Sequence, residues 1–323
     1  MRKDLVIGVD LGGTHLRTAL VDRVGNVLCR RKTETAVALG ARETRDRLLR
    51  ECMALMDEAL TAGGCVRAVG LGVAGKVDRA AGKVLFSPNL RALDGCALAP
   101  ELERAVGLPV VLENDANVFG IGEARAGAGR GIENWIGIIL GTGIGGCLVL
   151  RGDLWTGDGL GFVAETGHII VDPAGPRCVC GLKGCLEAHA SGRSLREGVE
   201  DAAARGDLGA GGLYERWKSG TLDAEAVCLA AEDGDPLAKG LFRRMGWALG
   251  LAIANLFTVL GIRSAIIGGG VAAAWNQFID PLRESLARHS CMFDPAEARI
   301  IPSELGEDAA LLGAGLLAWK LLK

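Results

Sequence analysis

Residues 4–21 read DLVIGVDLGGTHLRTALV and combine two apolar runs with a glycine-rich turn between them. The first run ends at Asp10, a Gly-Gly pair follows, and the second run resumes at Leu16. This pattern predicts two strands joined by a tip whose backbone N–H groups can cradle phosphate. The same pattern returns at 135–150, WIGIILGTGIGGCLVL. Two such hairpins, each at the start of a possible domain, predict two lobes that clamp one nucleotide.

Two side chains near the first tip carry chemistry of their own. Asp10, at the strand end, could hold a magnesium ion directly or through water. Thr14 could donate its hydroxyl to a phosphate. An ordinary glycine hairpin explains these residues equally well, so the residues alone leave both interpretations open.

Two other nucleotide-binding motifs are excluded. The chain has no G-x-x-x-x-G-K-[ST] sequence, which rules out a P-loop. Gly70, Gly72 and Gly75 match G-x-G-x-x-G, but KVDRAAGKVLF follows and predicts a hairpin. A dinucleotide site needs a helix at that point, so the Rossmann interpretation fails.

Length and composition bound the class of protein. The chain has 323 residues, 49% of them hydrophobic, which predicts a globular protein of two domains. A net charge of −3 gives no electrostatic case for nucleic acid or an anionic membrane. Most of the ten cysteines are scattered singly in apolar segments, which favours free thiols in a reducing cytoplasm. The N-terminus is too short and too charged for a signal peptide.

Alternating apolar patterns predict an α/β protein. The segment 42–62 reads as an amphipathic helix with Leu48, Leu49, Met53 and Met56 on its apolar side. Residues 245–262 carry no charge, and we expect a buried core helix there, with a membrane segment as the alternative. The remaining expected elements are strands at 26–33, 108–113, 264–271 and 298–305, helices at 97–107, 191–206, 241–261 and 307–322, and two short helices within 207–241.

The strand at 108–113 leads into ENDAN, residues 113–117. Asp115 would lie just past the carboxyl end of a strand, the edge where open α/β sheets bind ligands. Capping of the next helix is the structural alternative for Asn114 or Asp115. Two amides and two acids exceed what one cap needs, which favours a functional site. Asn89, in the turn FSPNL, could also face a polar ligand.

Residues 165–187, ETGHIIVDPAGPRCVCGLKGCLE, contain one imidazole and three thiols. His168, Cys178, Cys180 and Cys185 form a closed tetrahedral ligand set, which predicts a structural zinc ion. Such an ion would fix a loop that the chain alone could not hold, together with the flanking carboxylates of Glu165 and Glu187. His189 is an alternative ligand, and a metal-free loop with buried thiols is the alternative structure.

The strand at 264–271 ends in three consecutive glycines, with Gly269 at their centre. Bare backbone there would allow close packing against the adenine or ribose of a nucleotide. A plain turn between a strand and a helix explains these glycines nearly as well.

The motifs DLGGT, SPNL, ENDAN, LGTGIGG, ETGH and CVCGLKGCLE, in this order, resemble those of the ROK family of bacterial sugar kinases and repressors. The resemblance spans about residues 4–320. It implies an α/β fold of the two-lobed actin-like (ribonuclease H-like) type around an ATP and sugar cleft. It also implies Mg²⁺-ATP, a structural Zn²⁺ and a dimer or tetramer. The expected domains are 1–113, completed by the helix at 304–323, and 114–303 with the zinc loop.

Site residues follow from the matching motifs. By resemblance, Asp115 is the catalytic base that takes the proton of the attacking sugar hydroxyl. The positions that match sugar-binding residues are Asn89, Asn114, Asp115, Glu165, His168 and Glu187. The positions that match phosphate-binding and magnesium-binding residues are Asp10, Gly12, Gly13, Thr14, Gly141, Thr142 and Gly143.

The chain departs from the family pattern at four loop positions. Ala74 stands where proline is frequent, Cys147 replaces glycine or alanine, and Ala164 replaces the usual glycine before Glu165. Leu93 stands near the place of a usual tryptophan. None of these changes removes a catalytic group, but they alter the loops that shape the sugar pocket.

The resemblance predicts a kinase acting on the 6-hydroxyl of glucose. N-acetylmannosamine, N-acetylglucosamine, allose and fructose stay open as substrates. The rival class is a sugar-sensing transcriptional repressor. The first strand begins by residue 4, no basic recognition helix precedes it, and the net charge is negative, all of which disfavour that class.

Overall fold

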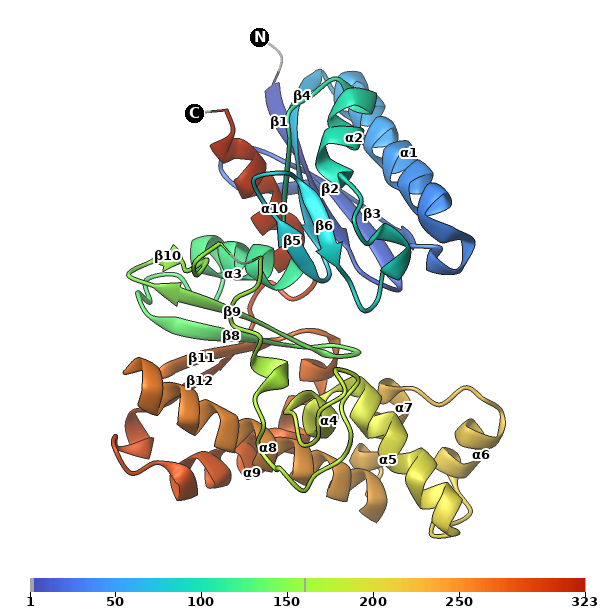
Figure 1. The fold of residues 1–323 in the computed structure, drawn as a ribbon, viewed down its shortest axis with the longest axis vertical. Coiled ribbons are helices and arrows are strands. Elements are labelled where there is room, and N and C mark those ends of the chain that lie inside the picture. The colour runs from blue at the N-terminus through green and yellow to red at the C-terminus, as the bar shows by residue number, and fades with distance from the viewer. Residues whose placement is uncertain (1–2, 160, 323) are drawn as a thin grey trace. The chain divides into compact units, whose positions relative to one another are not determined.

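The computed structural model describes residues 3–159 and 161–322. The chain divides into two compact units (Figure 1). The first unit comprises Met1–Glu133, Cys147–Val163 and Ser303–Lys323, and the second comprises Asn134–Gly146 and Ala164–Pro302. Residues 114–133 therefore group with the first unit. The domain limits expected from the sequence, 1–113 and 114–303, stay a prediction.

The first unit contains a five-stranded sheet with the strand order β3-β2-β1-β4-β7. The first three strands along the chain pair in antiparallel fashion, and β1, β4 and β7 are parallel. Gly12, Gly13 and Thr14 join β1 to β2, as the hairpin pattern predicts. The bounds are β1 Lys3–Leu11, β2 His15–Val21, β3 Val27–Glu34, β4 Gly64–Val73 and β7 Val110–Asn114.

A separate two-stranded hairpin, β5 Lys76–Asp78 and β6 Lys83–Phe86, follows β4. This hairpin stands where a dinucleotide-binding fold would need a helix. The rejection of the Rossmann interpretation is therefore confirmed.

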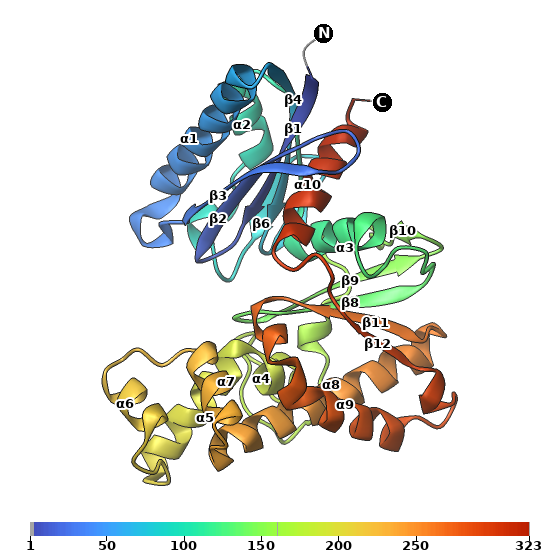
Figure 2. The same cartoon turned by 180° about the vertical axis from the view of Figure 1, so that it is seen from behind.

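Helices cover both faces of this sheet (Figure 2). On one face lie α1 Gly40–Thr61 and α2 Leu98–Val106, and Leu48, Cys52 and Leu55 of α1 join the main core. Met53, expected on the apolar side, is 45% exposed, because the buried positions follow Leu48 at steps of four and three residues.

Helix α10, Asp308–Lys320, lies on the other face of the sheet and also contacts α3, Asp115–Ala126. A side chain at Gly8 or Gly70 would collide with the backbone of α10. These glycines therefore let the helix lie directly on β1 and β4. A side chain at Gly122 of α3 would likewise collide with Ala309.

The second sheet has the strand order β10-β9-β8-β11-β12. Strand β11 is parallel to both β8 and β12, and the boundary between the two units runs through β9. The expected strand at 264–271 ends earlier, at Gly268, because Gly269 turns the chain with a φ of 90°. The bounds are β8 Trp135–Leu140, β9 Ile144–Leu150, β10 Asp153–Leu154, β11 Ser264–Gly268 and β12 Arg299–Pro302.

The helices of the second unit follow the expected order. Two short helices occupy the polar region after α5, as predicted, but α8 begins at Pro236 rather than at 241. Asp235 caps α8 by accepting from Ala238 N at 2.9 Å, and proline at the first position is preorganised for a helix. The bounds are α4 Glu187–Ala190, α5 Gly192–Arg205, α6 Gly212–Lys218, α7 Ala224–Glu232, α8 Pro236–Leu260 and α9 Trp275–His289.

The uncharged run 245–262 lies mostly in α8, which packs along α9. Side chains at Gly246 and Gly250 would collide with α9, so glycine permits this close packing. The predicted core helix is confirmed. Across the described ranges, no helix combines the length and the apolar character that a membrane span requires.

Candidate active site

Asn114 and Asp115 stand at the junction of β7 and α3. Asn114 is the N-cap of α3, because its Oδ1 accepts from Asn117 N at 3.1 Å. Its Nδ2 also donates to Gly75 O at 2.9 Å and to Asp115 Oδ1 at 3.0 Å. The capping role considered for Asn114 is therefore present, and the same amide aligns the neighbouring carboxylate.

Asp115 is the first residue of α3 and is half-buried. Its Oδ1 also accepts from Ala116 N at 2.9 Å. The positive end of the helix dipole favours a negative charge at this position. The carboxylate is thus oriented by two donors, and a positioned carboxylate suits the role of a proton acceptor.

Glu113, the second acid of the ENDAN motif, has a structural role. It is 1% exposed, and its Oε1 accepts from Asn117 Nδ2 and Asn114 N, both at 2.9 Å. Its Oε2 forms an ion pair with Arg79 Nε at 2.7 Å. Glu113 and Asn117 therefore hold the strand–helix junction in place.

The first glycine tip brings four predicted residues together. Gly12 N donates to His15 O at 3.0 Å, which closes the turn. Among the described residues, none accepts from the backbone N–H of Gly13 or Thr14, so these donors are available to a ligand. A Cβ at Gly13 would stand 2.8 Å from Asn89 Cβ, so glycine at this position lets the exposed Asn89 lie beside the tip.

Asp10 is buried beside this tip and faces Arg17 across the β1–β2 ladder. Burial raises the pKa of Asp10, and the Arg17 guanidinium, 3.0 Å from Oδ2, opposes that rise. Arg17 also contacts Glu307 Oε1 at 2.7 Å. No sequence motif indicated Arg17, although hairpin register would have placed it opposite Asp10.

The second tip, Gly141 to Gly143, belongs to the second unit. Ile144 N, at its end, donates to Glu187 Oε2 at 2.8 Å. Gly192 N donates to Gly141 O at 2.8 Å, and Arg193 N donates to Thr142 O at 3.2 Å. Hydrogen bonds therefore connect the second glycine tip to Glu187 and to the start of α5.

Two further residues, Arg193 and Gly269, lie close to this group. Arg193 Nη1 lies 4.0 Å from Glu187 Oε1, a contact that no motif indicated. A Cβ at Gly269 would collide with the backbone of Leu140, just before the tip, and Gly269 has left-handed backbone. The turn alone therefore explains why position 269 is a glycine. This turn lies next to the tip at 141–143, which is predicted to bind phosphate.

Glu165 occupies an inverse γ-turn. Its φ of −68° and ψ of 60° allow Thr166 N to donate to Ala164 O at 2.6 Å. Ala164 has a φ of 49°. The exposed Glu165 is followed directly by the short helix Thr166–His168, and His168 N donates to Glu165 O at 3.0 Å. Glu165 and His168 are therefore fixed relative to each other.

The predicted metal ligands converge. One ligand atom from each of His168, Cys178, Cys180 and Cys185 lies within 4.8 Å of all the others. Burial, together with hydrogen bonds to the neighbouring thiols, raises the pKa of Cys185 to about 12. Three thiols and one imidazole at this distance form a complete tetrahedral donor set, so these residues fit Zn²⁺, whose binding deprotonates the thiols.

The alternative ligand His189 takes a different role. It is 4% exposed, and its Nδ1 lies 3.1 Å from the donor Nε of Arg244 on α8. Burial, and secondarily the Arg244 charge, lowers the pKa of His189 to about 4. His189 therefore joins the cysteine loop to α8 as a neutral imidazole and stands outside the group of four.

Comparisons with known proteins agree with this set of motifs. The model of the ROK family matches residues 6–320. A glucokinase from Thermotoga maritima is 38% identical over 319 residues, which cover 97% of each chain. A crystal structure of a ROK family glucokinase from Streptomyces griseus, in complex with glucose and AMPPNP, gives a TM-score of 0.82 at 36% identity, covering 98% of this chain and 99% of that one.

A ROK family transcriptional regulator, a homologue of the E. coli MLC protein, gives a TM-score of 0.84 at 28% identity. The match covers 98% of this chain and 78% of the regulator. With these neighbours, the predicted α/β fold of the two-lobed actin-like type is confirmed.

Proposed function

The chain belongs to the ROK family, and we propose that it is an ATP-dependent glucokinase that transfers the γ-phosphoryl group of ATP to the 6-hydroxyl of glucose. The observation that carries this proposal is the Asp115 carboxylate, which two donors orient at the N-terminus of α3. The glucokinase from Thermotoga maritima and the glucose complex from Streptomyces griseus support the choice of sugar.

Phosphoryl transfer depends on positioning and on neutralising charge, with a carboxylate to orient the attacking hydroxyl. In this proposal Asp115 accepts the proton of the sugar hydroxyl as its oxygen attacks the γ-phosphorus. Carboxylate, amide and imidazole groups form hydrogen bonds with the other sugar hydroxyls. These groups belong to Asn89, Asn114, Glu165, His168 and Glu187.

The two glycine tips would hold the nucleotide. Backbone N–H groups of Gly13 and Thr14, in the first unit, are available as phosphate donors. Asp10 would hold Mg²⁺, which supplies charge neutralisation for the phosphates when it is bound. The further positions proposed for ATP are Gly12, Gly141, Thr142, Gly143 and Gly269.

We also propose that His168, Cys178, Cys180 and Cys185 bind a structural Zn²⁺. The ion would balance the thiolate charges and fix the 165–187 loop, and with it the two carboxylates at its ends. Glu187 is additionally held by Ile144 N, so its position depends on both the loop and the second tip. The protein is further proposed to be a cytoplasmic homo-oligomer, a dimer or tetramer.

The proposal is tested by measuring ADP release with Mg²⁺-ATP against glucose, fructose, allose and the two N-acetylhexosamines. We expect glucose to give the highest kcat/KM. The variant Asp115→Asn should lose turnover by at least about a thousandfold while binding glucose within tenfold of wild type. Asp57→Asn, at an exposed carboxylate of α1, is the matched control and should keep full activity.

Three outcomes would reject parts of the proposal. Activity retained by Asp115→Asn removes Asp115 as the base. A different preferred sugar replaces glucose with one of the alternatives. Silence across the panel from a folded protein, combined with tight sugar binding, favours the alternative of a sugar-sensing transcriptional regulator.

The zinc proposal has its own test. Cys180→Ser should lower the zinc content, measured by mass spectrometry, and lower the Tm. Cys291→Ser, at another exposed cysteine, should leave both unchanged. Fresh wild-type protein without zinc would contradict the assignment.

A further inference from the structure

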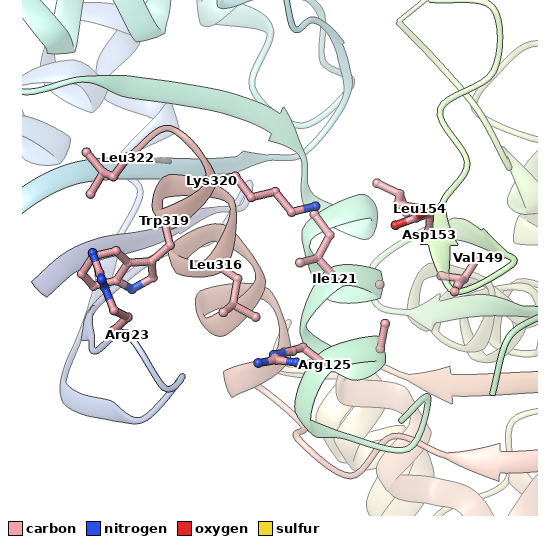
Figure 3. A pocket seen from close by; sticks show the side chains of 13 residues that line it. Arg23, Ile121, Arg125, Val149, Asp153, Leu154, Leu316, Trp319, Lys320 and Leu322 are labelled. Carbon is pink, nitrogen blue, oxygen red and sulfur yellow. The ribbon is translucent and has the colours of Figure 1, made fainter. Parts of the chain in front are cut away.

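The first unit has a pocket of about 620 Å³ that includes none of the residues proposed for sugar, ATP or zinc (Figure 3). Its walls come from the C-terminal half of α3, the end of α10, the segment 149–154 and Arg23. Its volume lies within the range of roughly 300–1,000 Å³ that is usual for small-molecule sites. The pocket therefore needs an explanation apart from the kinase reaction.

The floor of the pocket is apolar and fixed. Ile121, Leu154 and Leu316 line it, together with Val149 and the Trp319 ring. Trp319 is 6% exposed, and its Nε1 donates to Asp22 O at 2.9 Å, which holds the ring in place. A ligand with an apolar body would find a preformed surface here.

The rim of the pocket is cationic. Arg23, Arg125 and Lys320 line it, and among the described lining residues Asp153 is the single carboxylate. No described residue forms an ion pair with any of the three cations, and the Arg23 guanidinium lies 5.2 Å from the centroid of the Trp319 ring. Figure 3 shows Ile121 and Leu316 between Lys320 and Arg125.

A structural explanation accounts for only part of this arrangement. Arg125 and Lys320 stand in the last turns of α3 and α10, where a cation stabilises the helix dipole. That effect needs no shared pocket, and it does not apply to Arg23, which precedes β3 in the turn after β2. The three cations on one rim give the pocket a charge that favours anions.

We propose that this pocket binds a small organic anion with an apolar body, such as an aromatic or aliphatic carboxylate, sulfonate or phosphate monoester. The acidic group binds the Lys320 ammonium or the Arg125 guanidinium at the rim, and the apolar body covers Ile121, Leu316 and Leu154. The ligand would contact the C-terminal half of the helix that begins at Asp115.

The test uses the full chain and two matched fluorescent probes. Anilinonaphthalenesulfonate has an anionic group on an apolar body, and N-phenylnaphthylamine is its neutral counterpart. We expect the sulfonate to bind wild-type protein at least tenfold more tightly than the neutral probe. Equal affinity for both probes would overturn the charge argument.

Charge reversal then locates the site. The double variant Arg125→Glu and Lys320→Glu should raise the Kd for the sulfonate at least tenfold and change the Kd for the neutral probe less than twofold. The control, Arg283→Glu with Lys239→Glu, changes two exposed cations of the second unit by the same total charge and should keep the wild-type Kd. Equal loss in both double variants would mean non-specific attraction and would overturn the proposal.

Two further measurements test whether the probe binds in this pocket. Ile121→Glu, which places a carboxylate on the apolar floor, should abolish sulfonate binding while the Tm stays near that of wild type. Sedimentation of the charge-reversed variant should show an unchanged mass. A changed mass with an unchanged Kd would identify this surface as an interface between copies of the chain and reject the ligand site.

Discussion

Gly143 and Gly141 provide a paired test of how the second glycine tip holds Glu187. A Cβ at position 143 would stand 3.0 Å from Glu187 Cδ and closer still to Oε2. A Cβ at position 141 would find its nearest neighbour, Gly143 O, at 3.8 Å, an ordinary contact. Neither glycine has a φ in the left-handed region, so both accept alanine without backbone strain.

The magnitude follows from the hydrogen bond that Gly143→Ala would break. The Glu187 carboxylate must move by about half an ångström or more to reach a normal contact distance, which takes Oε2 away from Ile144 N, now 2.8 Å away. A hydrogen bond to a charged group contributes about 1.5–3 kcal/mol. At about 1.4 kcal/mol for each factor of ten, the glucose KM should rise roughly ten- to hundredfold.

Steady-state ADP release, measured while glucose and ATP are varied separately, checks this expectation. Gly143→Ala should raise the glucose KM and change the ATP KM less than threefold. Gly141→Ala should do the opposite, because a methyl group on the tip keeps phosphate from the backbone N–H groups. A glucose KM within threefold of wild type in Gly143→Ala, with an unchanged Tm, would refute the proposed role of Glu187.

Three other substitutions test single features of the fold. Ala164→Gly should raise the unfolding free energy by about 1 kcal/mol in denaturant, because it relieves left-handed backbone at an L-residue; a loss of stability would contradict the strain. The pKa of His189 falls to about 4 from the usual 6.5, so the contribution of this residue to stability is full above pH 6.5 and is lost as the pH falls toward 4. Between pH 7 and pH 5, the unfolding free energy of wild type should therefore fall by about 2 kcal/mol more than that of His189→Gln. Parallel pH curves for the two proteins would contradict the lowered pKa of His189. Glu123→Gln should cost about 2–4 kcal/mol in the same denaturant assay, since the buried carboxylate accepts from Ser303 Oγ at 2.5 Å and from three backbone N–H groups; a cost below 1 kcal/mol would show that these bonds tolerate an amide.

Short-range patterns gave the parts of the structure that depend on neighbouring residues. The ligand spacing after His168 indicated a cluster that the fold closes to within 4.8 Å. The ENDAN motif indicated a strand end and a helix start, and Asn114 does cap α3. In both cases the geometry follows from a few consecutive residues and one turn.

Long-range pairs could not be predicted in this way. Glu123 binds residues 303–305, and Glu187 binds the second tip, because the tertiary fold brings distant segments together. The early start of α8 is different, since the Asp235–Pro236 signal was present in the sequence. This capping signal lies within the polar region 207–241, where two short helices were expected, so the predicted start of α8 was too late.

The packing of α10 on β1 and β4 has a consequence for biosynthesis. Val6, Val21 and Ala68 are buried in one cluster with residues of α10, which the ribosome adds only after the entire second unit. At about 5–20 residues per second, the ribosome takes roughly 15 to 60 seconds to extend the chain from Val6 to α10. These apolar side chains stay exposed until α10 is added. The second unit can mature during that interval, whereas the first stays open to proteases and in need of chaperones. A circular permutant that places α10 ahead of β1 should shorten this vulnerable period without changing the finished fold.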